Sequence, residues 1–429
     1  MTQIFVKIKF LYPEIFRKIT PINTFAKLKS IIKYFNLNFT METNPQTTFT
    51  MKWTQADGFV YGDAGTTPSD KILALDMDDT LIKIKSGKKS PIDENDWLLL
   101  NEFVATTLQE YHSKGFKIII ISNQAGVQKG TAKIETIQKK IELVMEAIGL
   151  PMQAFIATHR NYYRKPSPGL WKFMCEKLNG DVKVDMKESV FCGDAAGRPG
   201  TNTKEADFEN TDYKFALNCG LNFKTPEMLY ENIHEDLPDI EFHPKTLKGG
   251  ETGQMEAELL IKKNNTKEMI IFVGPPPSGK TTFYKNYLAN DYVHVNNNEY
   301  KIKEEFIGAA EKIMKEGKSL VIDNLNHHNE NRKDYLDLAK KYEYNVRAFV
   351  FDVDEHLARH LNHVRMYNPH RKHDSKPVTR LVITNWFKEY VEPSVEEGFD
   401  SVEKIKFVAG PFENQHDEEM FFSYLCTMT

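Results

Sequence analysis

The sequence predicts an α/β protein built from two doubly wound parallel-sheet domains in tandem. Short apolar runs alternate with longer stretches that repeat apolar residues at helical spacing, and this alternation occurs twice along the chain. A length of 429 residues exceeds what one ordinary core supports, and a hydrophobic fraction of 41% excludes a disordered chain. A segment containing proline and glycine separates the two runs. We therefore expect a basic extension (1–52), a first domain (53–235), a linker (236–266) and a second domain (267–429).

Four apolar runs in the first domain have the length and composition of buried strands. They are Ile72–Leu75, Ile118–Ile121, Ala154–Ala157 and Val190–Cys192. Apolar residues recur at helical spacing in Trp97–His112 and Ile134–Ile148, which predicts helices there. Because strands that alternate with helices form parallel sheets, the polar residues that follow these strands should gather at one edge.

The second domain repeats this arrangement with four further apolar runs. They are Met269–Val273, Tyr292–Val295, Leu320–Ile322 and Ala348–Phe351. Each run precedes a polar segment that could carry part of a site, because ligands bind at the carboxyl ends of parallel strands.

Charge and cysteine content narrow the class of protein. The net charge is −4, so any surface that binds nucleic acid must be local. The four cysteines lack the C-x-x-C pairing of metal sites and are typical of reduced thiols in an intracellular protein. No apolar run approaches the roughly 20 residues that a membrane helix needs, so we expect no membrane partner.

The first 40 residues hold seven Lys or Arg but a single acid, Glu14, among apolar side chains. Such an amphipathic basic segment resembles an organelle transit peptide. The alternatives are a poorly ordered extension, or residues that precede a true start at Met41 or Met51. We expect a nuclear protein that is also found in the mitochondrion if this segment is a transit peptide.

Two carboxylates, Asp76 and Asp78, follow the first predicted strand in Asp76-Met77-Asp78-Asp79-Thr80. This spacing suits phosphoryl transfer, because one carboxylate can attack phosphorus while the other exchanges a proton with the leaving alcohol. A hard cation such as Mg²⁺ would offset the repulsion between these carboxylates and a phosphate. Taken alone, the motif could also be a turn that caps a helix.

Three later motifs favour a phosphoryl-transfer site over a turn that caps a helix. Ser122 follows the second predicted strand, Lys165 follows the third, and Asp194 lies in a Gly-Asp pair after the fourth. A hydroxyl and a cation can hold a phosphate, and a further carboxylate can bind Mg²⁺. Four strand ends in this order match the haloacid-dehalogenase phosphatase pattern, which is D-x-D-x-T, then S/T, K and G-D.

Longer strings in this half resemble the eukaryotic bifunctional polynucleotide kinase 3′-phosphatases. The strings are Thr158–His159, Tyr163–Pro166, Gly193–Pro199 and Phe215–Asn218. The resemblance implies a Rossmannoid domain of the haloacid-dehalogenase type, with Asp76 as nucleophile and Asp78 as acid and base. It implies further that Asp76, Asp78 and Asp194 hold Mg²⁺, and that Ser122 and Lys165 hold the transferred phosphate.

Four other positions are assigned by the same resemblance. Asp207 would support the metal through a water molecule. Asp79 stands where glycine is most common in the family, and we expect the chemistry to be retained. Two alternatives stay open for His159 and Arg198: they either touch the DNA strand or fix loops.

A phosphate-binding loop follows the first strand of the second domain. The segment Gly274–Thr281 fits G-x-x-x-x-G-K-[ST], whose backbone N–H groups suit the oxygens of a triphosphate. Lys280 would reach the β- and γ-phosphates, and Thr281 would hold Mg²⁺. The expected ATP-binding residues of this loop are Gly274, Ser278, Gly279, Lys280, Thr281 and Thr282.

A basic stretch at 356–380 is consistent with a lid over the ATP phosphates, with Arg359 and Arg365 among its cations. The alternative is a solvated helix face. Asp323 ends another predicted strand and would position metal or substrate.

The second domain resembles the kinase domain of the same family. The matching strings are Tyr292–Asn296, Ile322–Asn324, Ala358–His360, Glu392–Pro393 and Glu397–Phe399. Two departures matter. Asn298 occupies the position of the catalytic aspartate that accepts the 5′-hydroxyl proton, and His363 stands where relatives carry arginine. Either Glu299 replaces the missing base by a one-residue shift, or the kinase is weak or lost while nucleotide binding survives.

The resemblance implies an enzyme of DNA strand-break repair that uses Mg²⁺ and ATP. It would remove 3′-phosphates and phosphorylate 5′-hydroxyl ends. One alternative is a 3′-phosphatase with an impaired, kinase-like module that binds ATP and DNA. A third reading, disfavoured by the extended strings, is a small-molecule phosphatase fused to a metabolite kinase. We expect a monomer, and no docking through a forkhead-associated module, because the residues before Trp53 are too few to form one.

Overall fold

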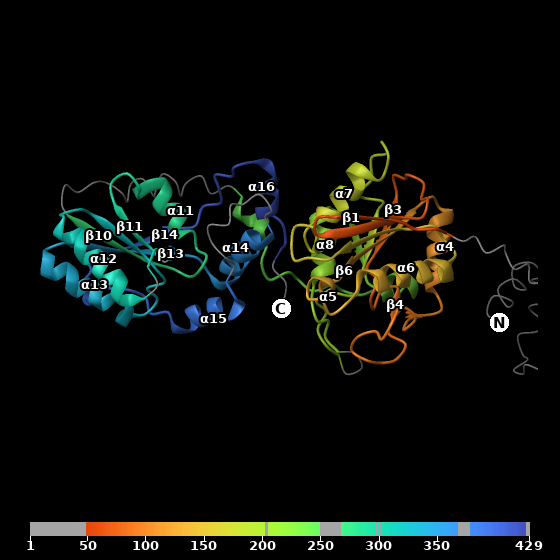
Figure 1. The fold of residues 1–429 in the computed structure, drawn as a ribbon, viewed down its shortest axis with the longest axis horizontal. Coiled ribbons are helices and arrows are strands. Elements are labelled where there is room, and N and C mark those ends of the chain that lie inside the picture. Colours follow the sequence, from red (N-terminus) through yellow and green to blue (C-terminus); the bar gives the residue numbers. More distant parts are fainter. Residues whose placement is uncertain are drawn as a thin grey trace, which may run out of the picture. The chain divides into compact units, whose positions relative to one another are not determined.

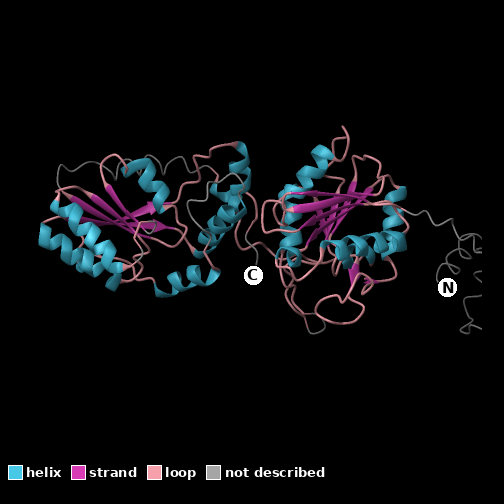
Figure 2. Ribbon diagram, viewed as in Figure 1, coloured by secondary structure: helices cyan, strands magenta, loops and turns pink. Residues whose placement is uncertain are grey.

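The computed structural model describes residues 49–201, 205–248, 267–296, 299–300, 302–367 and 378–425. These residues form two α/β units, one around a seven-stranded sheet and one around a five-stranded sheet (Figure 1). In each unit the strands lie between helices on both faces (Figure 2). This arrangement confirms the α/β prediction for both sheets.

Among the described residues, no helix combines the length and apolar character that a membrane crossing requires.

The first sheet has the strand order β1-β2-β7-β6-β3-β8-β9. The four predicted strands are present as β3, β6, β7 and β8 and run parallel, and a fifth parallel strand, β9, was not predicted. The hairpin of β1 and β2 adds an antiparallel edge beside β7 that the sequence did not predict. The strands are β1 (Lys52–Ala56), β2 (Phe59–Asp63), β3 (Ile72–Leu75), β6 (Lys117–Asn123), β7 (Gln153–Ala157), β8 (Val190–Cys192) and β9 (Asn222–Lys224).

The helix predicted from Trp97 begins later, at Val104. Leu98–Leu99 forms a short strand, β5, which pairs with Ile82–Lys83, β4. The carboxylate of Asp96 accepts hydrogen bonds from loop N–H groups, so this segment folds as a ribbon before the helix starts. The helix over Ile134–Ile148 is confirmed. The helices are α4 (Val104–Ser113), α5 (Ala125–Gln128), α6 (Ile134–Ile148), α7 (Gly169–Lys177), α8 (Thr211–Cys219), α9 (Pro226–Tyr230) and the 3₁₀ turn η1 (Pro244–Leu247).

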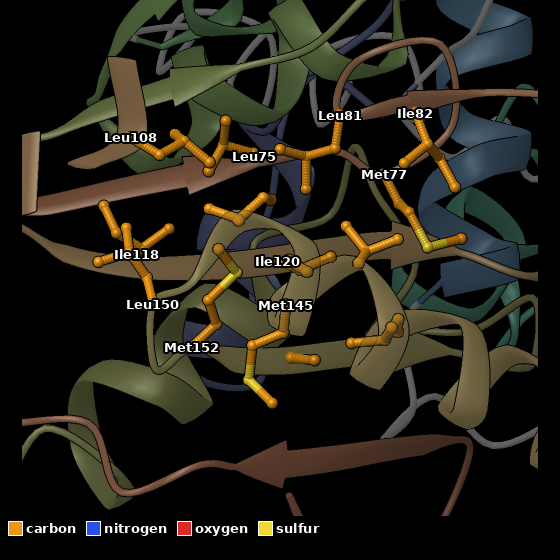
Figure 3. Close-up of a cluster of buried hydrophobic side chains, with 14 of the residues drawn as sticks. Leu75, Met77, Leu81, Ile82, Leu108, Ile118, Ile120, Met145, Leu150 and Met152 are labelled. Carbon is orange, nitrogen blue, oxygen red and sulfur yellow. The ribbon is translucent and has the colours of Figure 1, made fainter. Parts of the chain in front are cut away.

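Alternate residues of the central strands enter different cores, because side chains alternate across a strand. On one face, Leu75 of β3 and Ile120 of β6 lie in the cluster that also contains residues of α4 and α6 (Figure 3). On the other face, Ala74 and Ile119 lie in the cluster that contains residues of α7 and α8. The sheet is thus buried on both faces, which explains its continuous apolar strands.

The second sheet is entirely parallel, with the order β11-β12-β10-β13-β14. The four predicted strands are present with shifted ends, and the edge strand β14 was not predicted. The strands are β10 (Glu268–Val273), β11 (Val293–Asn296), β12 (Leu320–Asp323), β13 (Asn345–Asp352) and β14 (Ser401–Lys406). The helical segments are α11 (Lys280–Phe283), the π-helical turn η2 (Tyr284–Leu288), α12 (Lys303–Lys315), α13 (Asn329–Tyr342), α14 (Glu355–Tyr367), α15 (Arg380–Glu389), the 3₁₀ turn η3 (Val395–Glu397) and α16 (Gln415–Phe421).

Each sheet has a central strand whose two neighbours belong to different crossover connections. These strands are β3, between β6 and β8, and β10, between β12 and β13. In open parallel sheets, ligands bind beyond the carboxyl ends of the strands at such switch points. Asp76 follows β3 directly, and the phosphate-binding loop follows β10. The topology therefore places both predicted sites where this fold binds ligands.

The buried core of the first domain provides a test of its packing. Ile120 is fully buried, so Ile120→Ala should lower the free energy of unfolding by about 2–5 kcal/mol through lost contacts and a cavity. Ile92→Ala, at a side chain that is 61% exposed, should change it by less than about 0.5 kcal/mol. Urea unfolding followed by tryptophan fluorescence measures both variants. Equal effects from the two would contradict the assigned burial.

Candidate active sites

The first site is organised by Lys165, whose ammonium group lies between two carboxylates. Its Nζ donates to Asp76 at 2.6 Å and to Asp212 at 2.7 Å. Lys165 is 2% exposed and Asp76 is 9% exposed, so these ion pairs are shielded from water. The N–H of Asp76 donates to the carbonyl of Cys192 at 2.9 Å, which extends the β3–β8 pairing to the site residue itself.

The end of β6 fixes Lys165 and Ser122 beside Asp76. Asn123 holds the backbone of Lys165 at both its N–H and its carbonyl, each at 3.0 Å. The Nε2 group of Gln124 donates to Ser122 Oγ at 3.0 Å and to Asp78 Oδ2 at 2.8 Å. The structure thus brings together the four predicted residues Asp76, Asp78, Ser122 and Lys165, which come from three strand ends.

Three carboxyl groups could hold a metal ion. Oxygen atoms of Asp76, Asp194 and Asp212 lie within 4.8 Å of one another. Thr80 orients Asp194 by donating to its Oδ1 at 3.2 Å. Three hard oxygen ligands fit Mg²⁺, so the donor set agrees with the expected cofactor. The carboxylate of Asp78, which the sequence also assigned to the metal, lies outside this group and is exposed.

Asp212 is the site residue that the sequence analysis missed. It lies in the first turn of α8, after a polar segment, where an acidic residue is typical of ordinary helix starts. A Cβ at Gly193 would collide with the Asp212 carboxyl group, so glycine at 193 permits this close approach. The string Phe215–Asn218 begins three residues later, which was the available signal.

Burial dominates the electrostatics of this site. It raises the pKa of Asp76 well above the ordinary value; Lys165 opposes this increase, whereas Asp212 and Asp194 add to it. Burial, with the charges of Asp212 and Asp79, raises the pKa of Asp194 to about 7. Burial alone would lower the pKa of Lys165, but Asp212 and Asp76 raise it to about 12. A cation bound beside Asp76 and Asp194 would favour the ionised forms of these two carboxyl groups.

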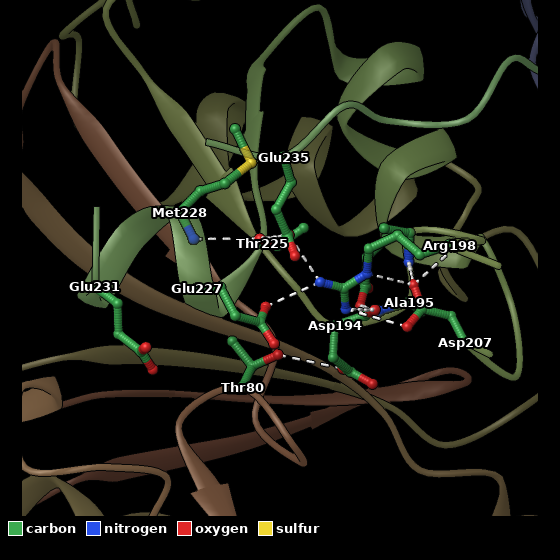
Figure 4. Close-up of polar contacts among 12 residues, drawn as sticks. Thr80, Asp194, Ala195, Arg198, Asp207, Thr225, Glu227, Met228, Glu231 and Glu235 are labelled. Atoms are coloured by element: carbon green, nitrogen blue, oxygen red, sulfur yellow. Dashed lines mark hydrogen bonds and ion pairs between the residues drawn. The ribbon is translucent and has the colours of Figure 1, made fainter. Parts of the chain in front are cut away.

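Arg198 fixes the loop that carries Asp194. Its guanidinium group donates to Asp207 at 2.8 and 3.1 Å, and to Glu227 and Glu235 at 2.9 Å each. Its Nη2 also donates to the carbonyl oxygen of Asp194 at 3.1 Å (Figure 4). These contacts support the loop-fixing alternative for Arg198. Asp207 binds Arg198 and the N–H of Ala196, instead of joining the group of three carboxylates.

Asp79 has the backbone conformation that explains the glycine usual at its position. Its φ angle is +52°, in the left-handed region that glycine adopts freely and that Asp and Asn tolerate better than other residues. His159 contacts Thr158 at 2.9 Å, which leaves both of its alternatives open.

The second site forms around the loop after β10. Lys280 is buried, and its Nζ donates to the carbonyls of Gly274 at 2.7 Å and Pro275 at 3.0 Å. A Cβ at Gly274 would lie 2.7 Å from Ser278 Oγ and 2.9 Å from Phe351 Cβ, so the loop needs glycine there. Burial lowers the pKa of Lys280 to about 8; Asp323 opposes this shift, and Arg365 adds to it.

Asp323 meets the loop from the end of β12. The hydroxyl of Thr281 donates to Asp323 Oδ2 at 2.7 Å, so the predicted metal-binding hydroxyl and the strand-end carboxylate are in contact. The charge of Arg365 contributes to the lowered pKa of Lys280. Arg359 instead pairs with Glu355 of its own helix. Thr282 is exposed on α11.

The position of the kinase base is only partly described. Asn298 and much of the basic stretch, including 368–377, lie outside the described residues. Glu299 is exposed and accepts a hydrogen bond from Asn296 at 3.4 Å. The Nδ1–H group of His363 donates to the carbonyl of Arg359 at 2.8 Å, and burial lowers the pKa of His363.

The fold and the two sites define a two-domain enzyme, with a haloacid-dehalogenase-like phosphatase domain followed by a P-loop kinase domain. Residues 71–230 match the family model described as polynucleotide kinase 3 phosphatase, and residues 269–393 match the model described as AAA domain.

Similar proteins cover both halves of the chain. It is 33% identical over 339 residues to the bifunctional polynucleotide phosphatase/kinase of Schizosaccharomyces pombe, across 79% of this chain and 80% of that protein. A protein of Acanthamoeba polyphaga mimivirus, named for the same two activities, is 30% identical and is matched over 94% of its length. The polynucleotide 3′-phosphatase of Saccharomyces cerevisiae is 27% identical across 37% of this chain and 87% of that protein. The chain belongs to the bifunctional polynucleotide phosphatase/kinase family.

The raised pKa of Asp194 should make the stability of the metal-free protein depend on pH. Its pKa rises from the ordinary 3.8 to about 7, so the folded state retains a proton that the unfolded state releases between these values. The contribution of Asp194 to stability should therefore decrease as pH rises from about 4 to 7. Asp194→Asn should reduce this loss, measured as the thermal midpoint in EDTA at pH 5 and pH 7.5.

The matched control is Asp57→Asn, which alters an exposed carboxyl group in the turn between β1 and β2. It should leave the pH dependence unchanged. An Asp194→Asn protein with the same pH dependence as the parent would contradict the assigned electrostatics.

Proposed function

We propose that the protein processes DNA ends in strand-break repair. The first site would hydrolyse 3′-phosphates through an aspartyl-phosphate, and the second would phosphorylate 5′-hydroxyl ends with ATP. The observation that carries the proposal is the buried contact of Lys165 with Asp76, at the strand end where the family's phosphatase motif begins. Relatives whose names contain both activities match this chain along most of their length. We also propose a nuclear location, where an enzyme that acts on DNA ends would find its substrate.

The roles that we propose for the residues of the first site follow the family resemblance. The ionised carboxylate of Asp76 attacks phosphorus, while Lys165 and Ser122 bind the phosphate oxygens. Asp78 is exposed and is held by Gln124, so it can protonate the leaving 3′-oxygen and later accept a proton from water. Mg²⁺ bound by Asp76, Asp194 and Asp212 would neutralise charge between the carboxylates and the phosphate.

In the second site, Lys280 and the loop N–H groups would bind the ATP phosphates, and Thr281 with Asp323 would hold Mg²⁺. Arg365 lies where its charge reaches Lys280, so it can stabilise charge that develops on the γ-phosphate. Glu299 accepts a hydrogen bond from Asn296, which ends the His-Val-Asn string (residues 294–296), and is the carboxylate that would replace the base by a one-residue shift.

Asn298 favours a second candidate function. Asparagine can orient a hydroxyl group but cannot accept its proton. The second domain would then be a binding module for ATP and DNA beside an active 3′-phosphatase. Both candidate functions include the 3′-phosphatase site. They differ in whether the second domain transfers phosphate from ATP to a 5′-hydroxyl end.

Two substitutions should separate the activities. Asp76→Asn should lower 3′-phosphatase activity on the order of 10⁴-fold or more, because the nucleophile is lost, and should leave ATP binding intact. Lys280→Ala should have the reverse effect. Release of phosphate from a 3′-phosphorylated oligonucleotide and equilibrium ATP binding measure these outcomes. Normal phosphatase activity in Asp76→Asn would refute the assigned mechanism.

The same assay distinguishes a polynucleotide substrate from a small one. An oligonucleotide 3′-phosphate should have a much higher kcat/KM than a free phosphomonoester such as p-nitrophenyl phosphate. Equal values would favour a small-molecule phosphatase.

A nicked duplex with 5′-hydroxyl and 3′-phosphate ends tests the kinase. Loss of a general base costs on the order of 10²–10⁴ in rate, so Asn298→Asp should raise phosphate transfer from ATP by a similar factor if the base is missing. Release of 3′-phosphate in the same tube is the internal control. Full transfer by the parent protein, with loss in Glu299→Gln, would instead assign the base to Glu299.

A further inference from the structure

We infer that His294 is a positioning residue of the second site: it orients the carboxylate of Asp323, and thereby the hydroxyl of Thr281, for binding of the Mg²⁺–nucleotide complex. The inference rests on the proposed nucleotide-binding role of this domain. It assigns a function to the histidine of the His-Val-Asn string, which the mechanism above does not use.

Asp323 receives two contacts on the same oxygen. His294 Nε2 lies 3.0 Å from Asp323 Oδ2, and Thr281 Oγ1 donates to that oxygen at 2.7 Å. His294 lies on β11 and Asp323 ends the adjacent parallel strand β12, so the pairing of two strands fixes this approach. Among the residues that the structure describes, neither Thr281 nor His294 is bonded to Oδ1. Because Oδ2 is held by these two contacts, the Oδ1 atom of Asp323 has a defined orientation.

The other ring nitrogen settles the tautomer of His294. The amide Nδ2 group of Asn296 lies 3.0 Å from His294 Nδ1, and an amide nitrogen only donates. Nδ1 must then accept, and Nε2 carries the hydrogen that is donated to Asp323. The amide orientation of Asn296 has independent support, because the same Nδ2 group donates to Glu299 Oε1 at 3.4 Å. One neutral imidazole thus satisfies every contact.

The imidazole is held on its face as well as at its edges. The ring of Tyr284 stacks on it, with centroids 3.8 Å apart and an interplanar angle of 11°. The hydroxyl of Tyr284 donates to the carbonyl of Tyr292 at 2.9 Å, which anchors the stacking partner to the segment before β11. The side chain of His294 is 15% exposed and that of Asp323 is 5% exposed. Ring rotation is therefore restricted, and the hydrogen bond to Asp323 has a fixed direction.

These contacts form one path between the two sides of the proposed kinase site. It runs from Glu299 through Asn296, His294 and Asp323 to Thr281. The first two residues flank Asn298 in the sequence, and the last lies in the phosphate-binding loop. Partners that orient metal ligands typically change metal affinity by about 10–100-fold when they are removed. Loss of the His294 hydrogen bonds should have an effect of that size.

The test measures nucleotide binding by the full-length protein, so it does not require an active kinase. Binding of the fluorescent analogue methylanthraniloyl-ATP is followed while Mg²⁺ is titrated. His294→Phe keeps an aromatic ring beside Tyr284 but loses both hydrogen bonds, and should raise the Mg²⁺ midpoint about 10–100-fold. Binding in EDTA should change far less. His294→Gln, which retains an N–H donor, should recover part of the loss.

Tyr344→Phe is the matched structural control. The Tyr344 hydroxyl is bonded to Met314 and Lys318 carbonyls in the core of the same domain, before β13. This variant should leave the Mg²⁺ midpoint unchanged. The inference is overturned if His294→Phe has the parent midpoint, or if Tyr344→Phe shifts it equally. Absence of Mg²⁺-dependent nucleotide binding in the parent would refute the proposed role of the domain itself, and the inference with it.

Discussion

The ammonium group of Lys165 is the contact on which the first site depends. Three carboxyl groups, from the ends of β3 and β8 and the start of α8, approach one another in a buried volume. Their mutual repulsion would separate them without a cation, and burial makes each charge more costly. Lys165 binds two of them directly. Asn123 fixes its backbone from the neighbouring strand, so the charge balance and the sheet geometry support each other.

The two domains use the same strand-end geometry for different electrostatic purposes. Around β3, carboxylates accumulate and are balanced by Lys165 and, farther out, by Arg198. Around β10, the loop concentrates N–H groups and a lysine, and the carboxylate of Asp323 approaches from β12. The first arrangement suits a nucleophile and a cation, and the second suits a polyphosphate. The family relationship and the two local chemistries therefore agree.

Interior strands and strand-end motifs were predictable from the sequence, because burial on both faces produces continuous apolar runs. The edges were not. β1 and β14 are partly exposed and rich in polar residues, so they lack that pattern. The late start of α4 depends on pairing between β4 and β5, a contact between segments with no local signal. Asp212 was missed because its role arises from the close approach to Gly193, which only the folded chain reveals. The tautomer of His294 was likewise not predictable from the sequence, because it follows from the contacts of His294 with Asp323 and Asn296 in the folded chain.

The tethering of Lys280 has a thermodynamic consequence. A free lysine side chain loses roughly 1.5–2 kcal/mol of rotamer entropy when it becomes ordered. Here the chain is already buried, and its ammonium group is held by two carbonyls of its own loop. Much of that entropy is therefore lost during folding, before any nucleotide arrives. Phosphate binding then becomes an exchange of acceptors around an ordered donor, and selectivity depends on how well the phosphate oxygens replace the carbonyls.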